Sequence, residues 1–223
     1  MLLLLLLGCH RPTSTRPTGP PLPAGLSAEV AAVMDRYPTD GSYPYYWPPD
    51  DGVWWGTTHD VWYLGVLLSP GDPEHRSHCV GITWEIAMEV LQAAAGEGQP
   101  INGLSPADML TFRTDWFVRE VGGLGAAEAV ERAGVGLRVP EDQLQRGDFL
   151  QMWGAASGHS GIFDRYERTD DGRPAIRYWS VHPFLGAIGT WTDAYGPYGL
   201  RVVYGARLLR REDWRPTRGE ERG

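Results

Sequence analysis

The chain has 223 residues, of which 42% are hydrophobic and 22% are charged, a balance that suits one globular domain with a substantial core. Acidic residues outnumber basic ones by 28 to 20, and the net charge of −8 argues against a nucleic-acid partner, which requires clustered positive charge. Every basic residue is arginine, so mechanisms that need a lysine, such as a phosphate-binding P-loop or an enzyme Schiff base, are excluded. The two cysteines, Cys9 and Cys79, provide no disulfide framework.

The first residues have the composition of an export signal. Six leucines follow Met1, and this run is far shorter than the roughly 20 apolar residues that cross a bilayer. Leu6-Leu7-Gly8-Cys9 resembles the lipobox of bacterial lipoproteins, in which the cysteine carries lipid, although no basic residue precedes the leucines. We therefore expect a lipoprotein-type signal peptide over residues 1–8 and lipidation of Cys9, which would anchor an exported protein to the membrane of the bacterial cell envelope, on its periplasmic or outer-membrane face. The alternative is an ordinary short apolar N-terminus.

Two further segments precede the main domain. Residues 9–24 are rich in proline and predict an extended tether, because such runs stay stiff and unpacked. Residues 25–60 form an aromatic-rich N-terminal segment, for which we expect mostly irregular structure laid across the main domain. One interpretation is a flap that fills a hydrophobic gap. The other is a stacking wall for a glycan or peptide ligand, since aromatic rings offer rigid contact area at low entropic cost.

Three helices are expected next. The first begins near Ser77 to Cys79, has apolar residues at helical spacing from Ile82 onward, and stops at Gly96. The second begins at Ser105-Pro106-Ala107-Asp108, where serine can cap the helix and aspartate can reach back to it. This helix is expected to carry Leu110, Phe117 and Val121. A short third helix is expected from Ala126 to Ala133, ending at Gly134.

After Pro140 the apolar pattern alternates, as in β-strands. Strands are expected at residues 149–153, 160–166, 175–181 and 200–209, with Asp170-Asp171-Gly172 as a hairpin turn. Helices followed by an antiparallel sheet indicate an α+β fold, which we place at residues 61–209. Residues 210–223 are expected to form a charged tail. The arginine-rich stretch from Arg207 to Arg222 is interpreted as a solvated, partly disordered end of the chain rather than a binding patch.

Cys79 is the candidate nucleophile because it lies where a helix begins. Free amides and the positive end of the helix dipole favour a thiolate there, so we expect a depressed pKa for its thiol. The same amides can hold the oxyanion that forms during acyl transfer, and the Cys79 amide is the expected first donor. The alternative is a neutral thiol that lines the core.

His159 is the candidate base, since it lies between glycines at the start of a strand. If the hairpin turns about Asp171, then His159 and His182 are neighbours across two antiparallel strands, with side chains on the same face. A slip of one residue would instead bring Val181 or Pro183 opposite. His182 is therefore expected to orient His159, with Ser180 as the fallback orienting group.

These residues together resemble a family. His78-Cys79-Val80-Gly81-Ile82 is similar to the cysteine motif of the NlpC-type, papain-like cell-wall peptidases. Gly147-Asp148-Phe149-Leu150 and His159-Ser160-Gly161-Ile162-Phe163 are similar to two of their strands, and His182 falls where the family has its third polar residue. The resemblance implies a papain-like fold, with N-terminal helices and the nucleophile at a helix start packed on an antiparallel sheet. It implies a cysteine peptidase or amidase that cleaves a peptide bond of peptidoglycan stem peptides, or a related cell-envelope amide, and needs no cofactor or metal.

The sequence departs from that family at several positions. His78 stands where an aspartate is usual, Val80 replaces serine, and the stretch between Cys79 and His159 is long. These departures leave the substrate open. Tyr63 and Gln151 are candidates for the second oxyanion donor, and together with Trp153 and Ser180 they are the candidate substrate-binding residues.

Three alternatives remain. A zinc site could use His75, His78 and Cys79 with His59 or Asp60, but the spacing is a poor chelating frame. A non-catalytic surface lipoprotein could bind glycan or protein through its aromatic segment. An acyltransferase on the same fold would use the same thioester with another acceptor. We expect a monomer with no nucleic-acid partner.

Overall fold

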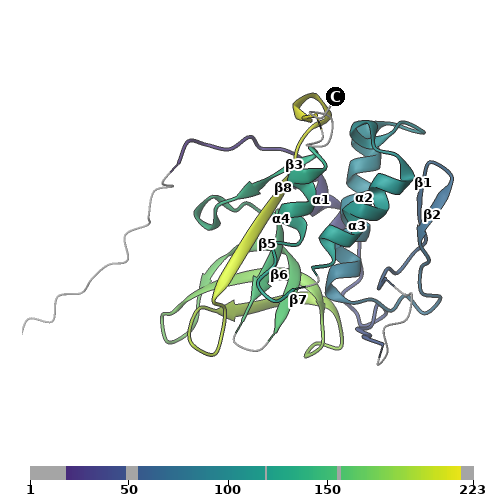
Figure 1. Ribbon diagram of the computed structural model, residues 1–223. Helices are drawn as coiled ribbons and strands as arrows, with labels where there is room; N and C mark the ends of the chain where they lie inside the picture. Colours follow the sequence, from purple (N-terminus) through teal and green to yellow (C-terminus); the bar gives the residue numbers. More distant parts are fainter. Residues whose placement is uncertain (1–18, 49–54, 119, 155–156, 217–223) are drawn as a thin grey trace, which may run out of the picture.

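The computed structural model describes residues 19–48, 55–118, 120–154 and 157–216, and these residues form a mixed α+β fold (Figure 1). The predicted signal peptide, Cys9 and most of the predicted tether lie outside these ranges. In the described part, no helix combines the length and the apolarity that crossing a membrane requires.

The helices are α1 (Ser27–Met34), α2 (Cys79–Ala95), α3 (Pro106–Trp116) and α4 (Ala126–Arg132), with short 3-10 turns η1 (Ile101–Gly103), η2 (Glu141–Gln143) and η3 (Arg211–Asp213). The strands are β1 (Val61–Tyr63), β2 (Val66–Ser69), β3 (Gly136–Val139), β4 (Phe149–Trp153), β5 (Gly158–Arg168), β6 (Pro174–His182), β7 (Ala187–Ala194) and β8 (Val202–Leu208).

The expected helix starts are confirmed. Helix α2 begins at Cys79 and is followed by Gly96, and α3 begins with the expected capping box. In that box the Ser105 hydroxyl accepts from the Asp108 amide at 3.2 Å, and the Asp108 carboxylate accepts from the Ser105 amide at 2.8 Å.

The course of α3 beyond its cap was predicted wrongly. The helix ends at Trp116, so Val121 lies beyond it and is 91% exposed. Its buried stripe is Met109, Phe112 and Trp116. That stripe begins one residue before Leu110, so the expected apolar face was offset by one position, and Leu110 faces outward at 40% exposure.

The main sheet has six antiparallel strands in the order β3-β8-β4-β5-β6-β7. The four expected strands are present, while β3 and β7 were not predicted. Both lie at sheet edges, and β7 lacks the clear alternation of buried and exposed residues on which strand prediction depends. Helices α2 and α4 pack on one face of the sheet, and the β1–β2 hairpin lies on the far side of α2 and α3 (Figure 1).

A β-bulge sets the register between β5 and β6. The turn at 170–172 has the expected position, and near it Arg165 pairs with Arg177. Asp164 is then skipped, and Phe163 pairs with Tyr178. This shift of one residue carries through Ile162 and Trp179, so that continuing the register places His159 opposite His182 instead of opposite Pro183.

A buried ion pair ties the end of the sheet to the N-terminal segment. Asp148 and Arg207 are both almost fully buried, and the Arg207 guanidinium donates to both oxygens of the carboxylate at 2.9 and 2.7 Å. The same carboxylate accepts from the Ser27 hydroxyl at 2.7 Å and from the Gln145 amide at 2.9 Å. With every acceptor satisfied, the buried charge is tolerated.

The interpretation of the C-terminal residues was wrong at its start. Arg207 is buried in β8 and does not belong to a solvated tail. The described residues beyond it also dock onto the domain, because the Arg211 guanidinium donates to the Ala95 carbonyl at 2.8 Å and the Arg215 amide donates to the Gly134 carbonyl at 2.9 Å.

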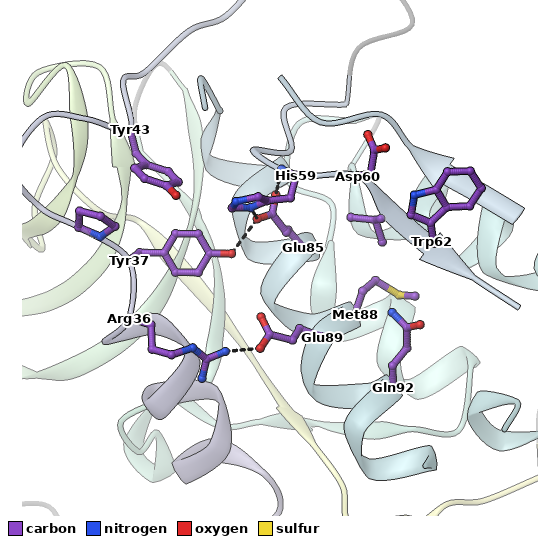
Figure 2. A pocket seen from close by; sticks show the side chains of 12 residues that line it. Arg36, Tyr37, Tyr43, His59, Asp60, Trp62, Glu85, Met88, Glu89 and Gln92 are labelled. Atoms are coloured by element: carbon purple, nitrogen blue, oxygen red, sulfur yellow. Dashed lines mark hydrogen bonds and ion pairs between the residues drawn. The ribbon is translucent and has the colours of Figure 1, made fainter. Parts of the chain in front are cut away.

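A second buried carboxylate, Glu85 on α2, joins the aromatic segment to the helix (Figure 2). It accepts from the Tyr37 hydroxyl at 2.7 Å and from the amide and hydroxyl of Thr58 at 2.5 and 2.6 Å. His59 Nδ1 lies 3.0 Å from the same carboxylate, and this hydrogen bond raises the pKa of His59. Glu85 therefore connects two parts of the segment before β1, at Tyr37 and at Thr58 and His59, to α2.

We expect the Asp148→Ala substitution to lower the free energy of unfolding by about 3–5 kcal/mol, because it leaves the Arg207 charge buried without its partner. Urea denaturation followed by circular dichroism would measure the change. The control is Glu128→Ala, which removes an exposed ion pair with Arg132 on α4 and should cost less than about 1 kcal/mol. Equal losses in the two variants would contradict the role assigned to Asp148.

Candidate active site

Cys79 is the first residue of α2 and is 8% exposed. His78 precedes it as the helix N-cap, and its Nδ1 accepts a hydrogen bond from the Gly81 amide at 3.2 Å. Burial lowers the pKa of His78 to about 4, so its ring is neutral near pH 7 and can act as this acceptor. A histidine therefore performs at this position the capping that aspartate, asparagine or serine usually performs.

The Cys79 sulfur lies against the open end of the β5–β6 ladder. Pairing of these strands ends at Ile162 and Trp179, although two further residues along each strand would pair Ser160 with Val181. Instead, the Ser160 amide is a hydrogen-bond partner of the Cys79 sulfur, and the Ser160 carbonyl accepts from the Ser180 hydroxyl at 2.8 Å. The helix start and the strand of His159 are thus joined through the residue that follows His159.

Ser160 is held on its other side by Gln151. The Ser160 hydroxyl donates to the Gln151 side-chain oxygen at 2.8 Å, and both side chains are buried. Gln151 and Ser180, expected as substrate-binding residues, therefore contact Ser160 rather than line the cavity beside Cys79. They position the strand that supplies the amide.

The two imidazoles are neighbours, as the register predicts. The ring centroids of His159 and His182 are 4.7 Å apart, with the planes inclined at 62°. His182 Nδ1 accepts from the Phe184 amide at 3.2 Å, and its ring stacks on Trp191 at 4.7 Å. These contacts fix the His182 ring, whereas Nε2 of His159 is buried and has no hydrogen-bond partner among the described residues.

The thiol and the base are both uncharged in this resting arrangement. Burial raises the pKa of the Cys79 thiol, although hydrogen bonds from the backbone of Ser160, Val80 and Cys79 itself oppose the rise. The expectation that the helix start depresses this pKa is therefore wrong in direction, because desolvation outweighs the amides. Burial, assisted by the charge of His182, lowers the pKa of His159 to about 3. Burial also lowers the pKa of His182, and the charge of Asp193 opposes this shift.

Cys79, His159 and His182 line one cavity of about 600 Å³. Asp193 on β7 is the carboxylate among its described lining residues, and it accepts from the Tyr178 hydroxyl at 2.8 Å and from the Trp191 indole at 3.1 Å. The remaining lining residues come from the aromatic segment, from β4 and the start of β5, and from three connections between strands: Tyr45, Trp47, Met152, Gly154, Ser157, Gly158, Pro183, Phe184, Tyr198, Gly199 and Leu200.

Two of the expected substrate-binding residues lie elsewhere. The Tyr63 hydroxyl donates to the Leu104 carbonyl at 2.7 Å and accepts from the Ile101 amide at 2.9 Å. Its hydrogen bonds are therefore made to buried backbone groups of the core. The Trp153 indole donates to the Gly123 carbonyl at 2.8 Å. Neither lines the Cys79 cavity, so the structure does not support Tyr63 as the second oxyanion donor.

Several lining residues were missed by sequence reasoning. Asp193 belongs to an unpredicted strand, and Tyr198 lies in the connection that follows it. Tyr45 and Trp47 fall in the segment for which a stacking wall was one interpretation, and both line the cavity. The aromatic composition was the available signal, but nothing in the sequence indicated which rings reach the thiol.

The histidines of the proposed zinc alternative have other partners. His75 stacks on Tyr43 with centroids 5.0 Å apart, His59 binds Glu85, and His78 caps α2. Within residues 19–48, 55–118, 120–154 and 157–216, no group of three or more His, Cys, Asp or Glu side chains is arranged to hold a metal ion.

A second cavity, of about 480 Å³, lies along the outer face of α2 (Figure 2). Glu85, Met88, Glu89 and Gln92 form its floor, with Tyr37 and Tyr43 on one side and His59, Asp60 and Trp62 on the other. Its described lining residues include no cysteine or serine. Arg36 and Glu89, which both line it, form an ion pair with each other. Cys79 lines the first cavity and not this one.

We expect stability to fall with acidification partly through His78. Its pKa is lower in the folded than in the unfolded chain, so its contribution is present above about pH 6.5 and is lost as the pH falls toward 4. Relative to a His78→Asn variant, which keeps a capping acceptor, the wild type should lose up to about 2 kcal/mol between pH 7 and pH 5. Urea denaturation at each pH measures this, and parallel pH profiles would contradict a buried neutral His78.

We expect iodoacetamide to alkylate Cys79 slowly in the native protein. The half-maximal rate should lie at a higher pH than in the urea-unfolded chain, where an unperturbed thiol titrates near about 8.5. Intact-mass spectrometry over pH 6–10 would follow the reaction, with Cys79→Ala as the control for other sites. Rapid native labelling well below the pH of the unfolded chain would instead show a resting thiolate.

The chain was compared with protein-family models, curated proteins and solved structures, and none of the three comparisons found a match. The case for a function therefore rests on the geometry of the residues described above.

Proposed function

We propose that the chain is a thiol-dependent amide hydrolase of the NlpC-type, papain-like class, with Cys79 as nucleophile and His159 as general base. The observation that carries this proposal is that three chemically suited side chains, distant in sequence, line one cavity at a helix start. The helix start, the two facing strands and the order Cys, His, His are the arrangement that the sequence resemblance implies.

In the proposed reaction, His159 accepts the Cys79 proton as the sulfur attacks the amide carbonyl. The amides of Cys79 and Val80, whose dipoles act on the sulfur at rest, are the expected donors to the oxyanion. His159 then gives the proton to the leaving nitrogen, and a water molecule hydrolyses the thioester. Because both resting groups are neutral, proton transfer accompanies attack rather than precedes it.

His182 and Asp193 support the base in this proposal. The His182 ring is fixed by the Phe184 amide and Trp191, and it contacts His159. Asp193 adds a negative charge to the cavity, which stabilises the imidazolium that forms when His159 takes the proton. A lipid on Cys9 would hold this site at the cell envelope, where the substrate is a stem peptide or a related envelope amide.

The two other candidate functions have less support. An acyltransferase would share the first half of the reaction and differ only in the acceptor of the thioester. A non-catalytic lipoprotein would use the exposed rings around the cavity for binding, but it gives no reason for the Cys79, His159 and His182 arrangement.

The test compares wild type, Cys79→Ala, His159→Ala and His182→Ala on purified peptidoglycan and, separately, on the lipid extract of a bacterial envelope. An amine-reactive reagent measures the newly released amino groups. We expect release from one substrate fraction, a loss of at least about 1,000-fold without Cys79, about 100-fold or more without His159, and a smaller loss without His182.

The matched control is His75→Asn, because His75 is exposed and asparagine tolerates its backbone φ of 56°. This variant should release amines at the wild-type rate. Equal release by wild type and Cys79→Ala from both fractions would remove the catalytic proposal.

A further inference from the structure

The mouth of the Cys79 cavity is ringed by exposed apolar side chains. Phe184 is 81% exposed, Tyr198 is 96% exposed and Trp47 is 58% exposed, and all three line the cavity. They come from three separate places in the chain: the aromatic segment, the β6–β7 turn and the β7–β8 connection. Large rings left in water around one opening indicate a surface that is covered when the protein acts.

The interior of the cavity continues this apolar character. Met152, Pro183 and Leu200 contribute to its wall, together with Gly154 of the β4–β5 connection and Gly158, the first residue of β5. Position 158 has to be glycine, since a Cβ there would lie 2.5 Å from the Trp153 ring. The cavity thus offers an apolar passage from the aromatic rim to the sulfur.

The charges around the cavity disfavour an anionic ligand. The chain has no lysine, and no arginine is among the described residues that line the cavity. Asp193 supplies a negative charge there, while His159 and His182 are neutral near pH 7 because burial lowers both pKa values. Stem peptides of peptidoglycan carry free carboxylates, and the described lining contains no cation to pair with them.

We propose that the Cys79 cavity binds the aliphatic chain of a neutral acyl group, so that the substrates are acyl amides or acyl esters rather than anionic stem peptides. This inference rests on the proposed function and specifies its substrate class. The acyl carbonyl carbon bonds to the sulfur, its bond to the leaving nitrogen or oxygen breaks, and the leaving group takes the proton held by His159. Water then cleaves the thioester, releasing a fatty acid and restoring the thiol.

The test uses the full-length chain with p-nitrophenyl acetate, butanoate, hexanoate and octanoate, plus p-nitrophenyl hydrogen glutarate as an anionic counterpart of a five-carbon ester, p-nitrophenyl pentanoate. Values of kcat/KM are divided by the rate of each ester with N-acetylcysteine, which removes intrinsic differences in ester reactivity. We expect kcat/KM to rise roughly threefold for each methylene that becomes buried, and the glutarate to react at least about 10-fold more slowly than the pentanoate.

Variants locate the effect. Phe184→Ala and Tyr198→Ala should reduce the ratio of the octanoate to the acetate value by several-fold, because each removes part of the apolar rim. Trp62→Ala is the control: Trp62 is 51% exposed on the β1–β2 hairpin and does not line the Cys79 cavity, so the ratio should stay at the wild-type value. Mass spectrometry of proteolytic peptides, with Cys79→Ala as the comparison, shows whether the acyl group is on Cys79.

The outcomes separate the two proposals. If no ester acylates Cys79 while Cys79 still releases amines from peptidoglycan, the acyl specificity is overturned and the proposed function stands; if neither substrate reacts through Cys79, the proposed function fails. If Cys79 is acylated but the rate is independent of chain length, or the glutarate reacts as fast as the pentanoate, the proposed function stands and the acyl specificity is overturned. The same holds if Trp62→Ala lowers the ratio as much as Phe184→Ala does.

Discussion

The site depends on one junction, at which the first turn of α2 meets the stretch of β5 that pairs with β4 but not with β6. The Ser160 amide would pair with Val181 if the ladder continued, and its bond to the Cys79 sulfur takes the place of that pairing. The end of the ladder is therefore not a defect of the sheet. It leaves the Ser160 amide free to interact with the Cys79 sulfur at the start of α2. Because Ser160 directly follows His159 in the chain, this contact brings the thiol close to the backbone of His159.

Buried carboxylates hold the parts around this junction. Glu85 joins α2 to the segment before β1, and Asp148 joins β4 and β8 to the chain that enters α1. Each carboxylate accepts three or more hydrogen bonds from different segments. The directions of these bonds fix the segments in one arrangement. Arginine is suited to the second of these contacts because its planar fork binds both carboxylate oxygens at once.

Local signals predicted much of this fold from sequence. The cap at Ser105, the glycine after α2 and the alternating strands are properties of short stretches, and the structure agrees with them. His159 and His182 are neighbours as expected, but the turn alone would place Pro183 opposite His159, and the bulge at Asp164 supplies the shift of one residue. The pKa of Cys79 and the position of Tyr63 were predicted wrongly, because desolvation and the partners of a hydroxyl depend on residues far away in sequence. Asp193 was missed because an edge strand has little periodicity.

The bulge at Asp164 has a consequence for how this protein can vary. A hairpin that gains one residue on each strand between the bulge and the turn keeps the same neighbours beyond it, so the far half of β5 and β6 is free to lengthen in matched pairs. If Asp164 instead paired with Tyr178, the register beyond it would shift by one residue and would place Pro183, not His182, opposite His159. Relatives of this chain should therefore differ in hairpin length by even numbers while retaining the bulge.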